Sequence, residues 1–310
     1  MKVLKQSVLA AVITLAGIGV AGAQVLGLGT AQGGTTKFIG QEVAKVVSQH
    51  TGLQMRSQAF ASSGQYGMRT NAGALEFGVS NVIETNYLYR GRELAPSPQE
   101  NLRMVTVFYS LPVTFFASRQ SGITNPEQLK GARVPVGWTS QPLGAWLWRG
   151  FLASHGIDYD SIGGVPVTAM PRQWDLFGQN QLDASFAVFG AAFIEDLAAR
   201  AGGITYLDTN DDPEAMKRMR EILPYAYVST DRHPQRDLTV KNISYDFVMY
   251  SSTHVPDDVV YKVVKALHQN PEPVEAIYKK KLRYAVEVGV PYHPGAIKYY
   301  KEVGLWPPKE

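Results

Sequence analysis

The sequence predicts an α/β protein made of two similar units. Short apolar runs typical of strands alternate with helical patterns from residue 24 to 89, and the alternation starts again after residue 121. A long β-rich run separates these two regions. Strands that alternate with helices form open, mainly parallel sheets. At about 150 residues per domain, a chain of 310 residues has room for two such units.

The first unit is expected to begin with a buried strand at 24–30. A Gly-rich turn at 31–36 leads into a helix at 38–50, where apolar residues recur near helical spacing. Gly52 ends this helix as a C-terminal cap. The other elements expected in this unit are strands at 53–59 and 77–80 and helices at 65–72 and 82–89.

The run Met104–Ala117 is long and β-rich, and it fits a crossing between two domains better than a strand of one compact sheet. A helix start near Asn125 opens the second unit, with Pro126 at the first helical position. This unit is expected to contain strands at 132–137, 163–169, 184–188 and 204–207 and helices ending at 155, at 173–178 and at 191–201.

The end of the chain is expected to return to the first unit through a strand at 245–251 and a helix at 256–269. The aromatic residues from Tyr278 to Trp306 are expected on helical segments. The domain division that follows is a leader at 1–23, the first part of lobe 1 at 24–110, lobe 2 at 111–230, and a return to lobe 1 with C-terminal helices at 231–310.

The N-terminal residues form a secretory signal peptide. Lys2 and Lys5 are the positive region, residues 8–20 are apolar, and Ala21-Gly22-Ala23 has the small-residue cleavage pattern. A membrane anchor is the alternative, but an apolar run of about 13 residues is shorter than the roughly 20 that cross a bilayer. Cleavage after Ala23 predicts a periplasmic or extracellular protein.

Composition excludes several classes of protein. The chain has 45% hydrophobic residues, which excludes disorder, and no cysteine, which excludes disulfide scaffolds, iron–sulfur clusters and thiol nucleophiles. Without Lys2 and Lys5, 28 basic residues balance 27 acidic ones, so no nucleic-acid partner is expected. The six histidines lack metal-ligand spacing and no GxSxG is present. No catalytic residue, metal or cofactor is therefore expected.

Three polar turns precede predicted helices, at 29–35, 60–65 and 137–141. Each follows a predicted parallel strand, and open α/β sheets bind ligands at the carboxyl ends of their strands. Helix starts attract anions, although an ordinary strand-to-helix turn explains each segment alone. Trp138 fits either a core or a ligand contact. The ligand-binding residues expected at these edges are Thr30, Gln32, Gly33, Thr35, Ser62, Ser63, Gln65, Asn81, Trp138, Thr139, Ser140, Gln141, Phe189 and Gly190.

Four segments carry a family resemblance along nearly the whole chain after the leader: GTAQGGTTKFIGQEVAKVV, FASSGQYGMRTNAGALEFGVSNVIETNYLYRG, LKGARVPVGWTSQPLGAWLWRGFLASHGI and DASFAVFGAAFIEDLA. The sequence resembles the TAXI family of substrate-binding subunits of TRAP (tripartite ATP-independent periplasmic) transporters. Thr36 and Lys37 stand where that family usually has aromatic residues, and Gln65 and Tyr66 replace a usual Glu-Asn pair. Asn81 stands about where an aspartate is common.

The resemblance implies a two-lobed periplasmic binding protein fold of the type II-like kind, with two open, parallel-rich sheets joined by hinge strands. It also implies a monomer that closes around a small organic anion, a glutamate-like amino acid or a dicarboxylate. The partner it implies is a membrane permease with two integral subunits. A receptor that presents its ligand to a membrane sensor kinase is the alternative, and a secreted enzyme on the same fold is a weaker one.

Lys37 would supply a positive charge for a second carboxylate if its side chain points inward, and the alternative is an exposed lysine. Replacing Lys37 with alanine is expected to weaken binding of an anionic ligand, because the charge would be lost. Ligand affinity of the Lys37→Ala protein measures this directly. Unchanged affinity would remove Lys37 from the site.

Overall fold

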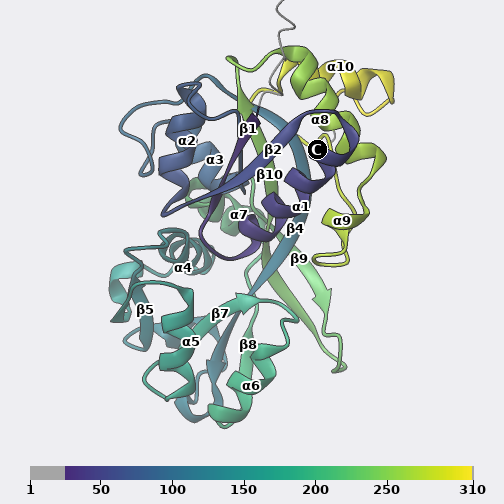
Figure 1. Cartoon of the computed structure of the whole chain (residues 1–310). Helices are drawn as coiled ribbons and strands as arrows, with labels where there is room; N and C mark the ends of the chain where they lie inside the picture. Colours follow the sequence, from purple (N-terminus) through teal and green to yellow (C-terminus); the bar gives the residue numbers. More distant parts are fainter. Residues whose placement is uncertain (1–24, 309–310) are drawn as a thin grey trace, which may run out of the picture.

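The computed structural model describes residues 25–308, which form two lobes connected by two long strands (Figure 1). Strand β4 (Leu102–Ser118) and strand β10 (Thr239–Ser252) each run through both lobes. They are the centre of an eight-stranded sheet with the order β2-β1-β3-β10-β4-β7, in which β8 also pairs with β4 and β9 with β10. Expectations for residues 1–23, including the signal peptide, lie outside the described residues.

Lobe 1 is built on three parallel strands. Strand β1 (Val25–Ala31) lies between β2 (Gln54–Phe60) and β3 (Phe77–Asn81), and β3 pairs antiparallel with the second half of β10. All five residues of β3 are buried, as expected for a central strand. The helices that follow these strands are α1 (Thr35–His50), α2 (Ser63–Asn71) and α3 (Val82–Tyr89).

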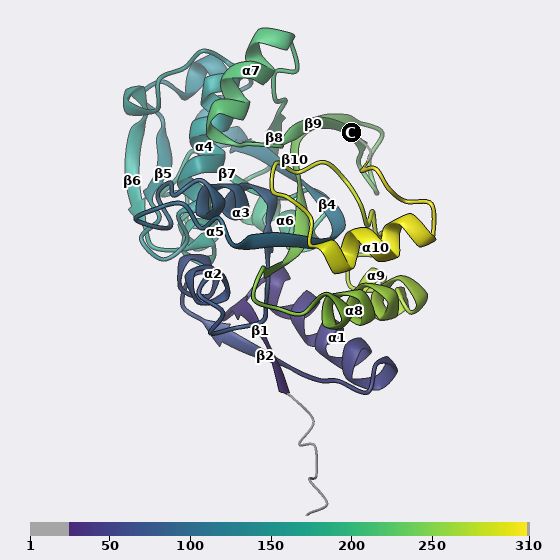
Figure 2. The same ribbon diagram turned by 90° about the horizontal axis from the view of Figure 1, so that it is seen from above.

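Three C-terminal helices complete lobe 1. Figure 2 shows α8 (Asp257–Gln269) lying beside α1, with α10 (Pro294–Glu302) packed on the other side of α8 and α9 (Glu272–Glu275) at its end. The buried face of α8 contains Val259, Val263 and Leu267, which recur at helical spacing. The end of the chain therefore packs beside α1.

Lobe 2 has an aromatic core. Phe115 of β4 packs against Phe151 at 4.0 Å and against Trp148 at 4.9 Å between ring centroids. Outside the large sheet, β5 (Arg133–Gly137) and β6 (Gly163–Val167) form a separate parallel pair. The remaining elements of this lobe are α4 (Leu143–Ser154), α5 (Met170–Gly178), β7 (Ala184–Val188), α6 (Phe193–Arg200), β8 (Ile204–Leu207) and α7 (Pro213–Ile222).

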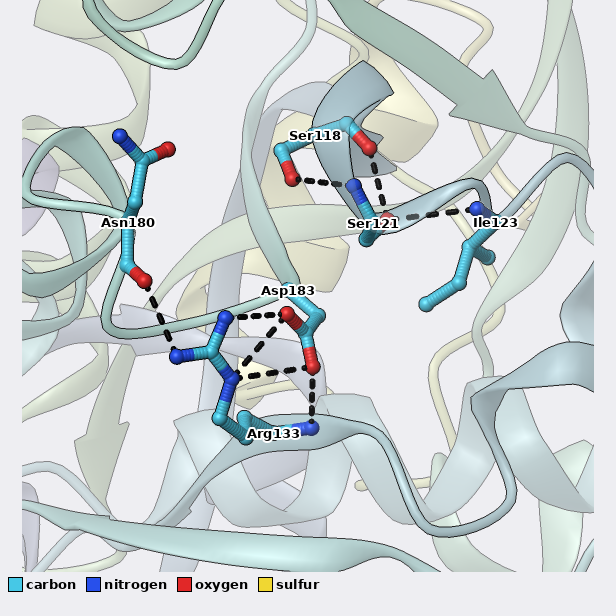
Figure 3. A network of polar contacts seen from close by, with 6 residues as sticks. All are labelled: Ser118, Ser121, Ile123, Arg133, Asn180 and Asp183. Atoms are coloured by element: carbon cyan, nitrogen blue, oxygen red, sulfur yellow. Dashed lines mark hydrogen bonds and ion pairs between the residues drawn. The ribbon is translucent and has the colours of Figure 1, made fainter.

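An ion pair joins β5 to the start of β7 (Figure 3). The guanidinium of Arg133 donates to the Asp183 carboxylate through Nε at 3.1 Å, and the Arg133 backbone N–H donates to the same carboxylate at 2.8 Å. The Arg133 guanidinium also reaches the Asn180 carbonyl oxygen at 3.0 Å. Partial burial acts to raise the pKa of the Asp183 carboxyl, but the hydrogen bonds and the charge of Arg133 together outweigh it and hold the pKa below its ordinary value.

The two long strands change partners where they pass between the lobes. Strand β4 pairs with β10 along residues 102–113 and with β7 and β8 along 113–118. The first half of β10 pairs with β9 (Tyr227–Arg232), and its register against β4 shifts between Asp246 and Val248. Such a bulge bends and twists a strand locally. The lobes therefore share one hydrogen-bonded backbone at their junction.

The sheets differ from the expectation in one respect. Instead of two separate sheets, one sheet is continuous through β4 and β10, and only β5 and β6 stand apart. The sheet is continuous because β10 pairs with β3 and β9, and β4 pairs with β7 and β8, while β4 and β10 also pair with each other. The expected lobe limits at 110 and 230 fall inside β4 and β9. Those limits stay a prediction.

The C-terminal aromatic residues are mostly not helical, which corrects the expectation. Tyr299 and Tyr300 lie in α10, but Tyr284 and Tyr292 form isolated bridges to β4, at Val107 and Met104. This segment contains glycine and proline, and its backbone finds hydrogen-bond partners on the open edge of β4 rather than within a helix. The region 209–239, for which the sequence predicted no element with defined bounds, contains α7 and β9.

Gly78 of β3 is expected to tolerate no side chain. A Cβ at this position would lie 2.4 Å from the ring of Tyr250 in β10, in the core of lobe 1. The Gly78→Ala protein should lose about 1–3 kcal/mol of unfolding free energy from this overpacking. Chemical denaturation measures the loss. Gly33→Ala is the control, since no atom lies within 4 Å of an added Cβ there. Equal losses of unfolding free energy in the two variants would contradict the close packing of Gly78 against Tyr250.

Candidate ligand-binding site

Three helices of lobe 1 begin at one edge of the sheet. Because β1, β2 and β3 are parallel, their carboxyl ends, at Ala31, Phe60 and Asn81, share this edge. Asn81 caps α3 by accepting from the Glu84 N–H at 2.9 Å, and Ser62 caps α2. The N-cap of α1 is Gly34, which offers no side chain. The first N–H groups of α1 are thus open to a ligand.

The start of α1 meets the C-terminal segment of the chain. The hydroxyls of Thr35 and Tyr278 lie 2.7 Å apart, although 243 residues separate them in the sequence. The Tyr278 ring packs edge-on against Tyr109 of β4, with 5.7 Å between centroids. The Tyr109 hydroxyl is buried and has no hydrogen-bond partner among the described residues. Three hydroxyl-bearing side chains therefore meet beside the open helix end.

An acidic side chain lies at the start of α3. The carboxylate of Glu84 accepts from the Ser80 hydroxyl at 2.9 Å and from the Asn81 side-chain amide at 2.7 Å. Burial raises the pKa of the Glu84 carboxyl above its ordinary value of 4.5, against the opposing effect of hydrogen bonds from Ser80, Ser63 and Asn81. By surface exposure the Glu84 residue as a whole is half-buried.

Tyr245 of β10 is buried in the same region. Burial raises the pKa of its hydroxyl, and the negative charges of Glu84 and Tyr278 raise it further. The site combines an open helix end and hydroxyls with one carboxyl group.

The lobes touch beside this site. The Tyr87 ring of α3 packs against the Trp146 ring of α4 at 4.4 Å, and the Tyr87 hydroxyl donates to the Ile222 carbonyl oxygen of α7 at 2.7 Å. The Trp146 indole N–H donates to the Glu93 carboxylate. Aromatic and polar contacts thus join lobe 1 to lobe 2 at the α3 side.

The structure places the residues expected in lobe 1 in three groups. Thr35 takes part in the hydroxyl cluster, and the side chains of Ser63 and Asn81 form hydrogen bonds with the Glu84 carboxyl. Ser62 is occupied as a helix cap. Gln32, Gly33 and Gln65 are exposed at the same sheet edge.

Thr30 is a correction. Its side chain is fully buried below the sheet edge, where its methyl group lies against Gly40 of α1. The sequence placed it at the turn, but β1 continues to Ala31, so Thr30 is still inside the sheet. Its side chain is not available to a ligand.

Trp138 of lobe 2 is the second correction. The ring is 1% exposed, packs against Phe186 at 5.5 Å between centroids, and donates its N–H to the Pro135 carbonyl oxygen at 3.2 Å. A positive φ of 53° turns this side chain back into the lobe. Of the two interpretations left open for Trp138, the structure supports the core residue.

The other residues expected in lobe 2 remain at its surface. Thr139 and Ser140 are exposed, and the Gln141 side chain accepts from the Met170 N–H at 2.8 Å. Phe189 packs edge-on against both Tyr206 and His233, and Gly190 is exposed. A ligand role for these residues stays a prediction, as it does for Lys37, which is half-buried.

Four residues of the site were not expected from the sequence. Glu84 had a detectable signal, because an Asn with an acidic residue three positions later is a helix-start pattern. Tyr109, Tyr245 and Tyr278 had none, since only the crossing of β4 and β10 and the path of the C-terminal segment bring them to the edge.

Comparison with known proteins identifies the family. The model of the NMT1-like family matches residues 28–304, so the chain belongs to this family. Among solved structures, a periplasmic transporter is similar at 15% identity, over 92% of this chain and 94% of that chain, with a TM-score of 0.52. MatC from Rhodopseudomonas palustris with bound malate has 13% identity over 91% and 97%, with a TM-score of 0.53.

A third similar structure is PhnD1 from Prochlorococcus marinus in complex with methylphosphonate, at 9% identity over 90% of this chain and 98% of that chain, with a TM-score of 0.56. At such identities the likeness concerns the fold. It confirms the expected α/β, two-lobed fold of periplasmic binding proteins. None of the helices within residues 25–308 is long and apolar enough to span a lipid bilayer.

The raised pKa of Glu84 makes stability depend on pH. The folded protein holds the Glu84 proton more tightly than the unfolded chain, so the stability from this proton is complete below pH 4.5 and is lost as pH rises through the folded pKa. Relative to Glu84→Gln, the wild-type protein should become less stable as pH rises from about 4 to about 8. Thermal unfolding at several pH values measures the difference. A Glu221→Gln control at an exposed position should show none, and a constant gap for Glu84→Gln would contradict the burial effect.

Proposed function

We propose that this protein is a periplasmic solute-binding protein that captures a small organic anion between its lobes, without chemical conversion. The ligand is a glutamate-like amino acid or a dicarboxylate. The observation that carries the proposal is the uncapped start of α1 beside the Thr35 and Tyr278 hydroxyls, at the edge of lobe 1. Helix N–H groups and the helix dipole favour an anion at such a point.

The protonation state of Glu84 distinguishes an amino acid from a dicarboxylate as the ligand. A ligand ammonium group would pair with the Glu84 carboxylate, which Ser80 and Asn81 already hold in place. A ligand carboxylate at the same position would require the Glu84 carboxyl to be protonated, since two like charges in contact repel each other. Thr35 and Tyr278 would bind the carboxylate, and Glu84 would bind the ammonium group.

Similar structures support an anionic ligand. MatC holds malate and PhnD1 holds methylphosphonate, and both are small anions bound on this fold. The contacts between α3 and lobe 2, at Tyr87 and Trp146, would close the site on one side and exclude water. Closed lobes strengthen electrostatic contacts with a buried ligand.

We further propose delivery to a TRAP-type permease with two integral subunits, by a TAXI-family binding protein that works as a monomer. The support is the order of the motifs, from GTAQGGTTKFIG to DASFAVFGAAFIEDLA, and the leader pattern at 1–23, which predicts export with cleavage after Ala23. The permease subunits would recognise the loaded, closed form.

A ligand panel tests the proposed function. Thermal unfolding of the refolded, ligand-stripped protein is measured with glutamate, glutamine, 2-oxoglutarate, succinate, neutral amino acids and sugars. A ligand at about 100 times its Kd should add about 2.7 kcal/mol of stability. Stabilisation by glutamate-like amino acids or dicarboxylates supports the proposal. Stabilisation by sugars alone would contradict it.

Tyr278→Phe tests the hydroxyl cluster with the stabilising ligand. A hydrogen bond to a charged group contributes about 1.5–3 kcal/mol, and about 1.4 kcal/mol corresponds to tenfold in Kd, so the affinity should fall by about tenfold or more. Titration calorimetry measures it. Tyr261→Phe is the matched control, because its hydroxyl contacts Glu302 at the far end of lobe 1. Equal affinity of the two variants would remove Tyr278 from the site.

A further inference from the structure

A partly buried ion pair lies at the junction of the lobes. One guanidinium nitrogen of Arg283 is 2.7 Å from each carboxylate oxygen of Asp246, and the Ser110 hydroxyl donates to the same carboxylate at 2.6 Å. The Asp246 side chain is 5% exposed and that of Arg283 is 34% exposed. We call Asp246 and Arg283 the hinge ion pair. Removing one partner of such a pair leaves the other charge unsatisfied.

The hinge ion pair sits where the two crossing strands leave lobe 1. Ser110 of β4 and Asp246 of β10 are opposite each other in the ladder, directly before the register shift in β10. Side chains alternate between the faces of a strand, so Asp246 points away from the face that carries its neighbour Tyr245. The hinge ion pair thus lies on the other face of β10 from the Tyr245 side chain.

Segments from both lobes meet in this cluster. The Tyr227 hydroxyl of β9 donates to the Ser110 hydroxyl at 2.7 Å. Arg283 belongs to the C-terminal segment, which is fixed to β4 in lobe 1 by a backbone hydrogen bond from Arg283 to Phe108 at 2.7 Å. A chain of polar contacts therefore runs from β9 through β4 and β10 to the C-terminal segment.

A pocket of about 270 Å³ lies over this cluster, with β9 on one side and the C-terminal segment on the other. Tyr227 and Ser229 line the first side, and Lys280 and Arg283 line the second. Ser110 and Asp246 lie between these two sides, because Tyr227 contacts Ser110 and Arg283 contacts Asp246.

We propose that Asp246 and Arg283 are positioning residues for ligand capture, whose ion pair at the crossing of β4 and β10 stabilises the arrangement in which the lobes touch. The pair fixes the twist of both strands at the bulge. A ligand that needs touching lobes binds with an apparent Kd equal to the intrinsic Kd divided by the population of that arrangement. The expected change in ligand affinity rests on the proposed function, whereas the expected change in the arrangement of the lobes does not.

The test measures the distance between the lobes without ligand. The sequence contains no cysteine, so Gln41→Cys in α1 and Arg172→Cys in α5 introduce two unique labelling positions, both exposed. Pulsed electron spin resonance on the spin-labelled protein gives the distribution of distances between the lobes. Asp246→Asn and Arg283→Gln are added singly and together.

The expected result is a broader distribution with longer distances in each single variant, and no further change in the double variant, because one interaction is lost in all three. Asp183→Asn is the matched control. It removes an ion pair of similar chemistry within lobe 2 (Figure 3), so it should lower the unfolding temperature and leave the distances unchanged. With the ligand found by the panel, Kd should rise about three- to tenfold in Asp246→Asn and stay the same in Asp183→Asn.

Distances in Asp246→Asn that overlay those of the wild type would overturn the proposal and leave the pair a structural contact. Tyr227→Phe keeps the test decisive if the charge variants do not fold. It removes one hydroxyl contact to Ser110 and should broaden the distribution in the same direction, to a smaller extent. An unchanged distribution in that variant would also overturn the proposal.

Discussion

The antiparallel pairing of β4 with β10 is the constraint on which the structure depends. These two strands are hydrogen-bonded to each other along residues 102–113, and each has further partners in lobe 1 and in lobe 2. The strands of both lobes join the large sheet only through these two strands. Their crossing also sets the position of Tyr109 and Tyr245 beside the helix starts. Changes in the angle between the lobes must therefore be absorbed in a few residues of two strands.

The chemistry of the site follows from this geometry. Parallel strands bring the starts of α1, α2 and α3 to one edge, and only α1 lacks a side-chain cap. The start of α1 carries a partial positive charge, and the Glu84 carboxyl lies at the start of α3 on the same edge. Ionised Glu84 would give this edge both signs of charge, which suits a ligand that also carries both. Hydroxyls from Thr35 and Tyr278 provide orientation without adding net charge.

Much of the fold could be predicted from the sequence, because local periodicity and turn residues determine it. The strands at β7 and β8 and the helix α3 begin and end at the expected residues. The C-terminal tyrosines could not be placed, since their backbone pairs with β4, a contact of long sequence separation. Thr30 was expected at the turn but lies inside β1, which ends at Ala31. Trp138 was left open between a core and a ligand contact, and its positive φ places it in the core. Site residues held by tertiary contacts, such as Tyr278, left no local signal.

A small ligand that is captured between two lobes moving about β4 and β10 should draw the lobes together. Small-angle X-ray scattering of the mature protein, with and without the stabilising ligand, measures this change. We expect a smaller radius of gyration on ligand addition, with the secondary structure unchanged by circular dichroism. A ligand that binds tightly and leaves the radius of gyration the same would contradict it.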